Sequence, residues 1–131
     1  MTTESSQDYV NEQFRLADEA LSDARYLLND NRLKAGANRA YYAMFHAAQA
    51  ALSHVNVRAP KTHVGTINLL GRHIIKTGKM DKRFSKDLQD AFDLRQQTDY
   101  QIHVNIGEAE VMDTVERAKD FVAEGKRVIG I

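Results

Sequence analysis

Apolar residues recur at alternating steps of four and three along the chain, and this spacing constrains the fold more than any other feature. Near the start the steps fall on Val10, Phe14, Ala17, Leu21, Ala24 and Leu28. Such a stripe lies along one face of an α-helix, whereas a half-buried strand would alternate apolar and polar residues. One proline and seven glycines in 131 residues also disfavour a turn-dense β fold. The chain is therefore expected to be helical.

The same spacing predicts five helices, with breaks at polar or glycine-containing segments. The predicted helices cover residues 10–28, 33–55, 60–78, 80–104 and 111–129. Residues 40–57 carry no formal charge and are mostly small or apolar, so the second helix should be the central, most buried one. Its polar residues make it unsuited to crossing a membrane. We predict one all-α domain over residues 1–131, an antiparallel up-and-down bundle with short connections.

Composition excludes several classes of chemistry. The chain has no cysteine, which excludes disulfides, thiolate zinc sites and a cysteine nucleophile. No phosphate-binding glycine loop and no metal-ligand spacing of His and carboxylates is present, so we expect neither a cofactor nor a metal. The polar first residues lack the apolar core of a signal peptide, and a cytoplasmic protein without membrane attachment is expected.

Charge is balanced overall but unevenly distributed. The chain has 18 Lys and Arg against 18 Asp and Glu, yet residues 31–80 contain eight of those cations and no acid. The acids therefore lie in the two flanking segments. A basic block suits an anionic partner such as a nucleic acid or nucleotide. Alternatively, basic and acidic helices neutralise each other within the bundle.

A charged residue falls on the apolar stripe of the fourth helix. Continuing the steps from Phe84 and Leu88 places Arg95 on the core side, where a guanidinium is costly to bury without a partner. Asp99 follows four residues later and can pair with it. Tyr100 and His103 come next on the same side. These residues form either a reactive group or a simple ion pair that sets the helix register.

Polar residues also follow one line of the second helix. They are Asn38, Tyr42, His46, Gln49 and Ser53, with Arg39 in the same turn. Buried polar groups need partners, so the line faces either a subunit interface or an internal hydrogen-bond network. At the start of the third helix, Lys61 and His63 could contact a phosphate, whereas Thr62 could simply cap the helix.

Three blocks of the sequence resemble the small prokaryotic HEPN-domain proteins. The blocks are Asn38–Ala48 (NRAYYAMFHAA), Lys61–Gly65 (KTHVG) and Arg95–Tyr100 (RQQTDY). The resemblance implies a helical bundle that forms a homodimer, with the arginine motif near the cleft between the two copies. Many members of that family are ribonuclease toxins of toxin–antitoxin pairs. A minimal nucleotidyltransferase is often their partner.

The ribonuclease motif of that family, an arginine followed after four to six residues by a histidine, is altered here. Position 100 is Tyr, and His103 comes only after seven residues. In the active relatives the histidine acts as a base and the arginine stabilises the charged phosphorane. The resemblance also makes Tyr100 the candidate acceptor of a transferred nucleotide, because some family toxins are silenced in that way.

Three functional hypotheses follow. The first, which we favour, is a dimeric bundle associated with RNA or a nucleotide that works with a minimal nucleotidyltransferase. The second is a metal-independent endoribonuclease toxin that uses Arg95 and His103. The third is a non-catalytic interaction bundle. The candidate catalytic residues are Arg95, His103 and Tyr100, and the candidate binding residues are Asn38, Arg39, Tyr42, Lys61, His63 and Asp99.

Overall fold

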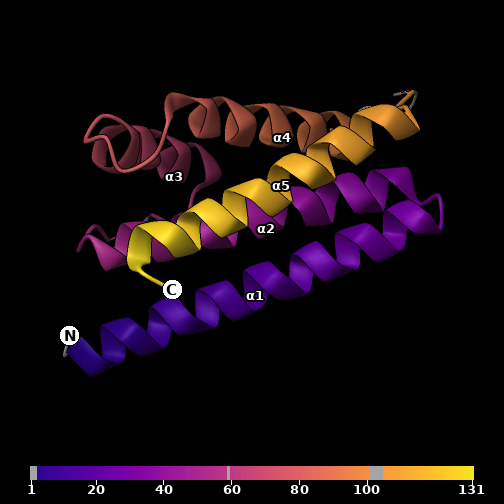
Figure 1. Ribbon diagram of the computed structural model, residues 1–131. Coiled ribbons are helices and arrows are strands. Elements are labelled where there is room, and N and C mark those ends of the chain that lie inside the picture. Colours follow the sequence, from indigo (N-terminus) through magenta and orange to yellow (C-terminus); the bar gives the residue numbers. More distant parts are fainter. Residues whose placement is uncertain (1–2, 59, 101–104) are drawn as a thin grey trace.

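The computed structural model describes residues 3–58, 60–100 and 105–131, with side chains from residue 6 onward. Five α-helices and one π-helical turn account for most of these residues, and no strand occurs among them (Figure 1). The elements are α1 (Thr3–Asn29), α2 (Leu33–His54), α3 (His63–Leu70), the π-turn η1 (Gly71–Ile75), α4 (Lys82–Tyr100) and α5 (Glu108–Ile129). The predicted all-α bundle of five helices is therefore confirmed.

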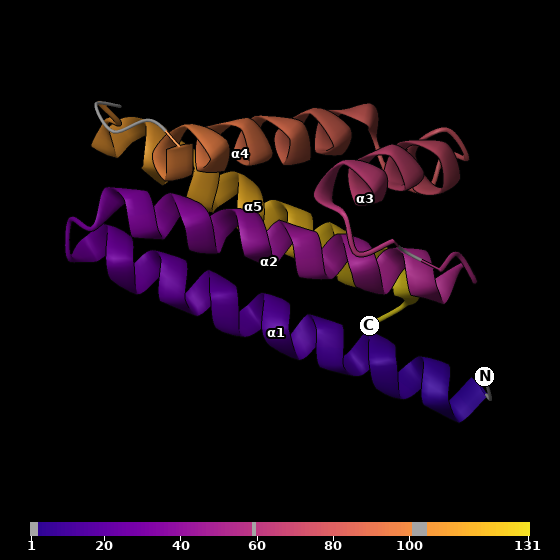
Figure 2. The ribbon, with the colours of Figure 1, turned by 180° about the vertical axis from the view of Figure 1, so that it is seen from behind.

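Helix α2 occupies the centre of the bundle. It packs along α1 and also contacts α5, α4 and α3. Viewed from the front, α5 crosses one side of α2 (Figure 1). From behind, α2 lies in front of α5 between α1 and the α3–α4 pair, and no helix covers this side of it (Figure 2).

Small side chains bring the central helices close together. The fully buried alanines of α2 are Ala37, Ala40, Ala43, Ala47, Ala48, Ala50 and Ala51. On α5, a Cβ added at Gly125 would lie 3.3 Å from the ring of Phe14 and 3.5 Å from the Cβ of Ala47. Close packing of this kind gains dispersion and hydrophobic energy from short interhelical distances. It confirms the prediction that the second helix is the most buried.

The third helix differs from its prediction at both ends. Its N-cap is Thr62, not Pro60, because the Thr62 hydroxyl accepts a 3.1 Å hydrogen bond from the backbone N–H of Gly65. Pro60 lies before the helix, where its carbonyl accepts from the Thr66 hydroxyl. After Leu70 the α-helix gives way to η1. Val64, expected on the apolar stripe, is 58% exposed.

The other helices depart less from their predicted ranges. Helix α1 begins at Thr3, before the first stripe residue. Helix α4 begins at Lys82, where the Asp81 carboxylate accepts from the N–H of Arg83, so the buried Met80 belongs to the preceding loop. The predicted end of that helix at residue 104 lies outside the described residues. No described helix is both long and apolar enough to cross a membrane.

Candidate functional site

Arg95 of α4 is buried and faces α2, as the stripe predicted. Its exposed fraction is 8%. One terminal nitrogen, Nη1, donates to the hydroxyl of Tyr42 at 3.1 Å and lies 3.6 Å from a carboxylate oxygen of Asp99. The latter distance makes an ion pair but not a hydrogen bond. The Nε–H of Arg95 is buried and has no partner among the described residues. The predicted pairing with Asp99 therefore exists but satisfies the guanidinium only in part.

Aromatic rings surround the Arg95 guanidinium. Its central carbon lies 5.3 Å from the ring centre of Tyr41, 5.7 Å from that of Tyr42 and 5.8 Å from that of Phe92. Contacts between a cation and ring faces stabilise the charge without neutralising it. The guanidinium therefore keeps its positive charge available to an anion.

Arg39 of α2 brings a second guanidinium to the same place. Its central carbon lies 5.3 Å from the ring centre of Tyr42. Its Nε is also buried and unpartnered, and none of its atoms forms an ion pair within the described part of the chain. Two cations therefore flank one tyrosine ring, and each keeps an unused buried N–H donor.

His63 completes the group. Its Nδ1 lies 2.7 Å from the hydroxyl of Tyr41, with the donor set by the tautomer. Burial, and secondarily the charge of Arg95, lowers the pKa of His63 below its usual 6.5. Burial raises the pKa of Tyr41 above 10.0, so its hydroxyl stays protonated and can donate to the neutral imidazole. We call Arg39, Tyr41, Tyr42, His63 and Arg95 the Arg95 cluster.

The local sequence explains how His63 reaches this position. Thr62 caps α3, which makes His63 the first residue of the helix. A Cβ at Gly65 would lie 2.5 Å from the Thr62 hydroxyl oxygen and 2.6 Å from Cγ of Pro60. The chain can pass so close to itself only because residue 65 has no side chain. The Thr62 capping alternative is thus confirmed, and the cap presents His63 to α2.

The predicted site residues divide into three groups. Arg39, Tyr42, His63, Arg95 and Asp99 come together. Asn38 is half-buried on α2 beside Arg39 in sequence, and Lys61 is exposed just before α3. Tyr100 is 75% exposed at the end of α4. His103 lies outside the described residues.

Tyr41 is the site residue that sequence reasoning missed. It lies in the mostly small and apolar stretch of α2, and its exposed fraction is 0%. The available signal was its hydroxyl, because a buried tyrosine usually needs a hydrogen-bond partner. That partner, His63, is 22 residues away in the sequence.

The polar line of α2 is largely satisfied within the chain. Buried Gln49 accepts from the Tyr9 hydroxyl at 3.2 Å and donates to the Thr66 hydroxyl at 3.0 Å. Nδ1 of His46 lies 2.9 Å from the Gln13 amide oxygen. Burial, and secondarily the charge of Arg39, lowers the pKa of His46. At these two positions the internal network is therefore the correct alternative.

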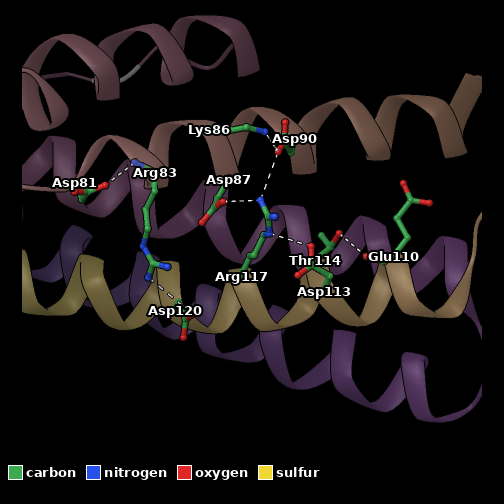
Figure 3. Close-up of polar contacts among 10 residues, drawn as sticks. All are labelled: Asp81, Arg83, Lys86, Asp87, Asp90, Glu110, Asp113, Thr114, Arg117 and Asp120. Carbon is green, nitrogen blue, oxygen red and sulfur yellow. Dashed lines mark hydrogen bonds and ion pairs between the residues drawn. The ribbon is translucent and has the colours of Figure 1, made fainter.

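A separate hollow of about 300 Å³ between α4 and α5 is acidic (Figure 3). Arg117 of α5 lies inside it, 2.7 Å from Asp87, 3.5 Å from Asp90 and 2.9 Å from Asp113. The contacts with Asp87 and Asp90 tie α5 to α4. Within the described chain, no group of three or more His, Asp or Glu side chains is arranged to hold a metal ion.

The basic block of residues 31–80 is not neutralised by ion pairs to acidic helices. Of its eight cations only Arg32 forms an ion pair among the described residues, and its partner Asp30 is two positions away. The described ion pairs of residues 81–131 instead join these residues to each other, apart from the pair between Lys126 and Asp18 of α1. Most of the positive charge of the block therefore has no carboxylate partner.

Comparisons with known proteins give a consistent result. A family model of the HEPN domain matches residues 10–129. A "UPF0332 protein" of Thermotoga maritima is 34% identical over 115 residues, which cover 88% of this chain and 86% of that protein. Another of the same name, from Archaeoglobus fulgidus, is 34% identical over 122 residues, or 93% of this chain and 96% of that protein. "Putative toxin MJ0605" of Methanocaldococcus jannaschii is 33% identical over 85 residues, 65% of this chain and 63% of that protein.

Proposed function

This chain belongs to the HEPN domain family, and we propose that it is a toxin-like protein that binds RNA or nucleotide phosphates at the Arg95 cluster. The names of two relatives describe them as putative toxins. The proposal extends that description to this chain and assigns it a site. A minimal nucleotidyltransferase is the partner that we propose for it in a toxin–antitoxin-like pair.

One observation carries the proposal: Arg39 and Arg95 flank Tyr42, and each has a buried Nε–H without a partner. A buried donor left unsatisfied costs about 1–3 kcal/mol, and a buried cation adds to that cost. A phosphate supplies both acceptor oxygens and negative charge, and guanidinium groups match its geometry. An arrangement that is costly when empty and satisfied by a phosphate favours anion binding.

The test is binding of a fluorescently labelled single-stranded oligoribonucleotide, measured by anisotropy at several salt concentrations. We expect Arg95→Met and Arg39→Met each to weaken binding about tenfold, and each to lower the slope of log K against log salt by about 0.7. The matched control is Arg25→Met, which removes an exposed cation from α1. Equal affinity for wild type and both cluster variants would refute the proposal.

The nucleotidyltransferase partner has a specific proposed target, the hydroxyl of Tyr100. This side chain is 75% exposed at the end of α4, within reach of another protein. In the proposed transfer the phenol oxygen attacks the α-phosphorus of ATP, an O–P bond forms, pyrophosphate leaves and the phenolic proton passes to a base. Intact-protein mass spectrometry after incubation with the enzyme and ATP would detect the adduct. Tyr100→Phe should abolish it, and an unchanged adduct on that variant would contradict the assignment.

A second candidate function, metal-independent RNA cleavage, is favoured by the neutral imidazole of His63 near Arg95. A neutral imidazole can take the proton of a ribose 2′-hydroxyl, whose oxygen then attacks the adjacent phosphorus. The 5′-oxygen leaves with a proton, and a guanidinium stabilises the charge that develops. His103 is the alternative base.

Cleavage of single-stranded RNA in the presence of EDTA would test this function. Loss of cleavage in Arg95→Met and His63→Gln, with activity retained in His103→Gln, would identify His63 as the base. The opposite pattern would identify His103. Intact RNA at stoichiometric wild-type protein would leave binding without cleavage.

A further inference from the structure

A groove of about 830 Å³ lies beside the Arg95 cluster, and nothing above assigns it a ligand. It opens between the first half of α1, the second half of α2 and the connecting residues Asn56, Val57, Arg58 and Lys61, which lie between α2 and α3. We call it the α1–α2 groove. Its volume is in the range of pockets that hold small organic ligands.

The rim of the α1–α2 groove is positively charged. Arg58 and Lys61 line it, both are exposed, and neither has an ion-pair or hydrogen-bond partner within the described residues. No Asp or Glu is among the lining residues that the structure describes. Two cations without a carboxylate beside them in this described lining attract an anion, and a phosphate group binds both Lys and Arg.

The walls of the groove are aromatic and are held in place. The Tyr9 ring is 39% exposed, and its hydroxyl is anchored on Gln49. The ring of Phe45 is half-buried, and its centre lies 4.9 Å from that of His63. The amide groups of Gln13 and Asn56 also line the groove. Fixed rings with amides nearby are the features by which proteins stack and hydrogen-bond an unpaired nucleobase.

We propose that the α1–α2 groove binds a nucleoside phosphate, with the base against Tyr9 and Phe45 and the phosphate on Arg58 and Lys61. Phe45 joins the groove to the Arg95 cluster, because its ring contacts both His63 and Tyr42. A single RNA strand can thus place one phosphate at Arg95 and a neighbouring nucleotide in the groove. The RNA form of this inference rests on the proposed function. A free nucleotide would bind the groove independently of it.

The experiment compares three probes on the full chain: AMP, ribose 5-phosphate and a labelled single-stranded oligoadenylate. Isothermal titration calorimetry measures the first two, and anisotropy measures the third. The double variant Arg58→Gln/Lys61→Gln should bind AMP and oligoadenylate at least about tenfold more weakly than wild type, because the loss of even one charged hydrogen bond is worth about this factor. The matched control, Arg25→Gln/Lys34→Gln, removes the same charge from two exposed cations near the α1–α2 turn.

The base contact has its own variant. Tyr9→Leu keeps an apolar side chain but removes the ring, so AMP should weaken severalfold while ribose 5-phosphate is unchanged. Ribose 5-phosphate should also bind wild type more weakly than AMP does. Equal binding of the two would show that the groove recognises phosphate alone and would overturn the assignment of the base.

The combination of probes and variants distinguishes the groove inference from the proposed RNA binding at the Arg95 cluster. If both AMP and oligoadenylate bind wild type and the groove variant equally, the groove inference fails while the Arg95 site stands. If AMP binding depends on Arg58 and Lys61 but no RNA binds, the free-nucleotide form stands and the proposed RNA function fails. If neither probe binds wild type, both are wrong.

Discussion

Arg95 is a charged residue at a core position, where its burial lowers the stability of the fold. Its position on an apolar stripe would suit a leucine or methionine, and its exposed fraction of 8% shows that it occupies a core position. One hydrogen bond to Tyr42 and an ion pair of 3.6 Å to Asp99 compensate its burial only partly. Residues that lower stability in this way are characteristic of binding and catalytic sites.

We therefore predict that Arg95→Met leaves the free energy of unfolding unchanged or raises it by about 1 kcal/mol, while RNA binding falls. Methionine fills a similar volume without an unsatisfied donor, and Asp99, about a third of whose side chain is exposed, stays hydrated. Urea unfolding of both proteins measures the change. A loss of more than about 2 kcal/mol would instead make Arg95 a structural residue.

The two half-buried histidines, His63 and His46, predict how stability depends on pH. The folded-state pKa values of His63 and His46 are lowered by burial and by nearby arginines. The unfolded chain therefore takes up protons first as the pH falls through 6.5, and the stability present above that pH is progressively lost below it. Thermal unfolding between pH 8 and pH 5 should show this decrease.

His63→Gln and His46→Gln provide the control for that dependence. Each substitution removes one titrating group, so the decrease in melting temperature with acid should become shallower in each variant. At pH 8 both imidazoles are neutral in the folded and unfolded states, and that pH gives each variant its reference stability. A steeper decrease in either variant would contradict the assignment.

At the scale of elements, α4 and α5 are held together by charge as well as by apolar contact. Asp87 is buried in that interface, with a side chain only 9% exposed, and Arg117 reaches it from α5 (Figure 3). Phe84 and Phe121 meet edge to face beside them. Because Arg95 lies on α4, this interface also determines where its guanidinium stands relative to α2.

Removing the charge of Arg117 should weaken the interface between α4 and α5. We predict that Arg117→Met lowers the free energy of unfolding by about 2 kcal/mol, because it leaves Asp87 buried without its partner. Arg15→Met is the matched control: its ion pairs with Glu12 and Glu19 are exposed, so stability should not change measurably. Chemical denaturation measures both. Equal effects of the two substitutions would show that the pair of Arg117 with Asp87 stabilises the fold no more than an exposed ion pair does.

At the scale of the whole molecule, charge is separated along the bundle. The unpaired cations Arg58, Lys61, Arg72, Lys76 and Lys79 lie around the α2–α3 connection and η1, whereas the acidic hollow lies between α4 and α5. The zero net charge conceals this separation. We therefore expect an anionic partner to approach the surface around the α2–α3 connection and η1 more favourably than the hollow between α4 and α5.

We predict a homodimer in which the Arg95 clusters of the two copies lie near the cleft between them. The resemblance to the HEPN proteins motivates this expectation. Light scattering at micromolar concentration should give about twice the 14.8 kDa of one chain. A mass of one chain would refute the dimer while leaving the RNA-binding test to stand alone.

Much of the fold could be predicted because it depends on local periodicity. The stripe Val111, Val115, Ala118 and Val122 is buried on α5 as expected. Errors arose where tertiary contacts or a cap override the pattern. Val64 fits the apolar spacing but is exposed, since Thr62 sets the start of α3 and so rotates that residue outward.

Helical periodicity is encoded in residues one turn apart, so a helical bundle with a cation on the core stripe of its fourth helix could be predicted from the sequence. The three-dimensional structure was needed to show that Tyr41 contacts His63, that Arg39 and Arg95 lie beside the same tyrosine ring, and that Arg58 and Lys61 line a groove with Tyr9. The Tyr41–His63 contact joins residues 22 positions apart, and the hydrogen bond from Arg95 to Tyr42 joins residues 53 positions apart. They depend on the angles at which the helices cross and on the register in which they pack. The fit of side chains across the whole core determines both.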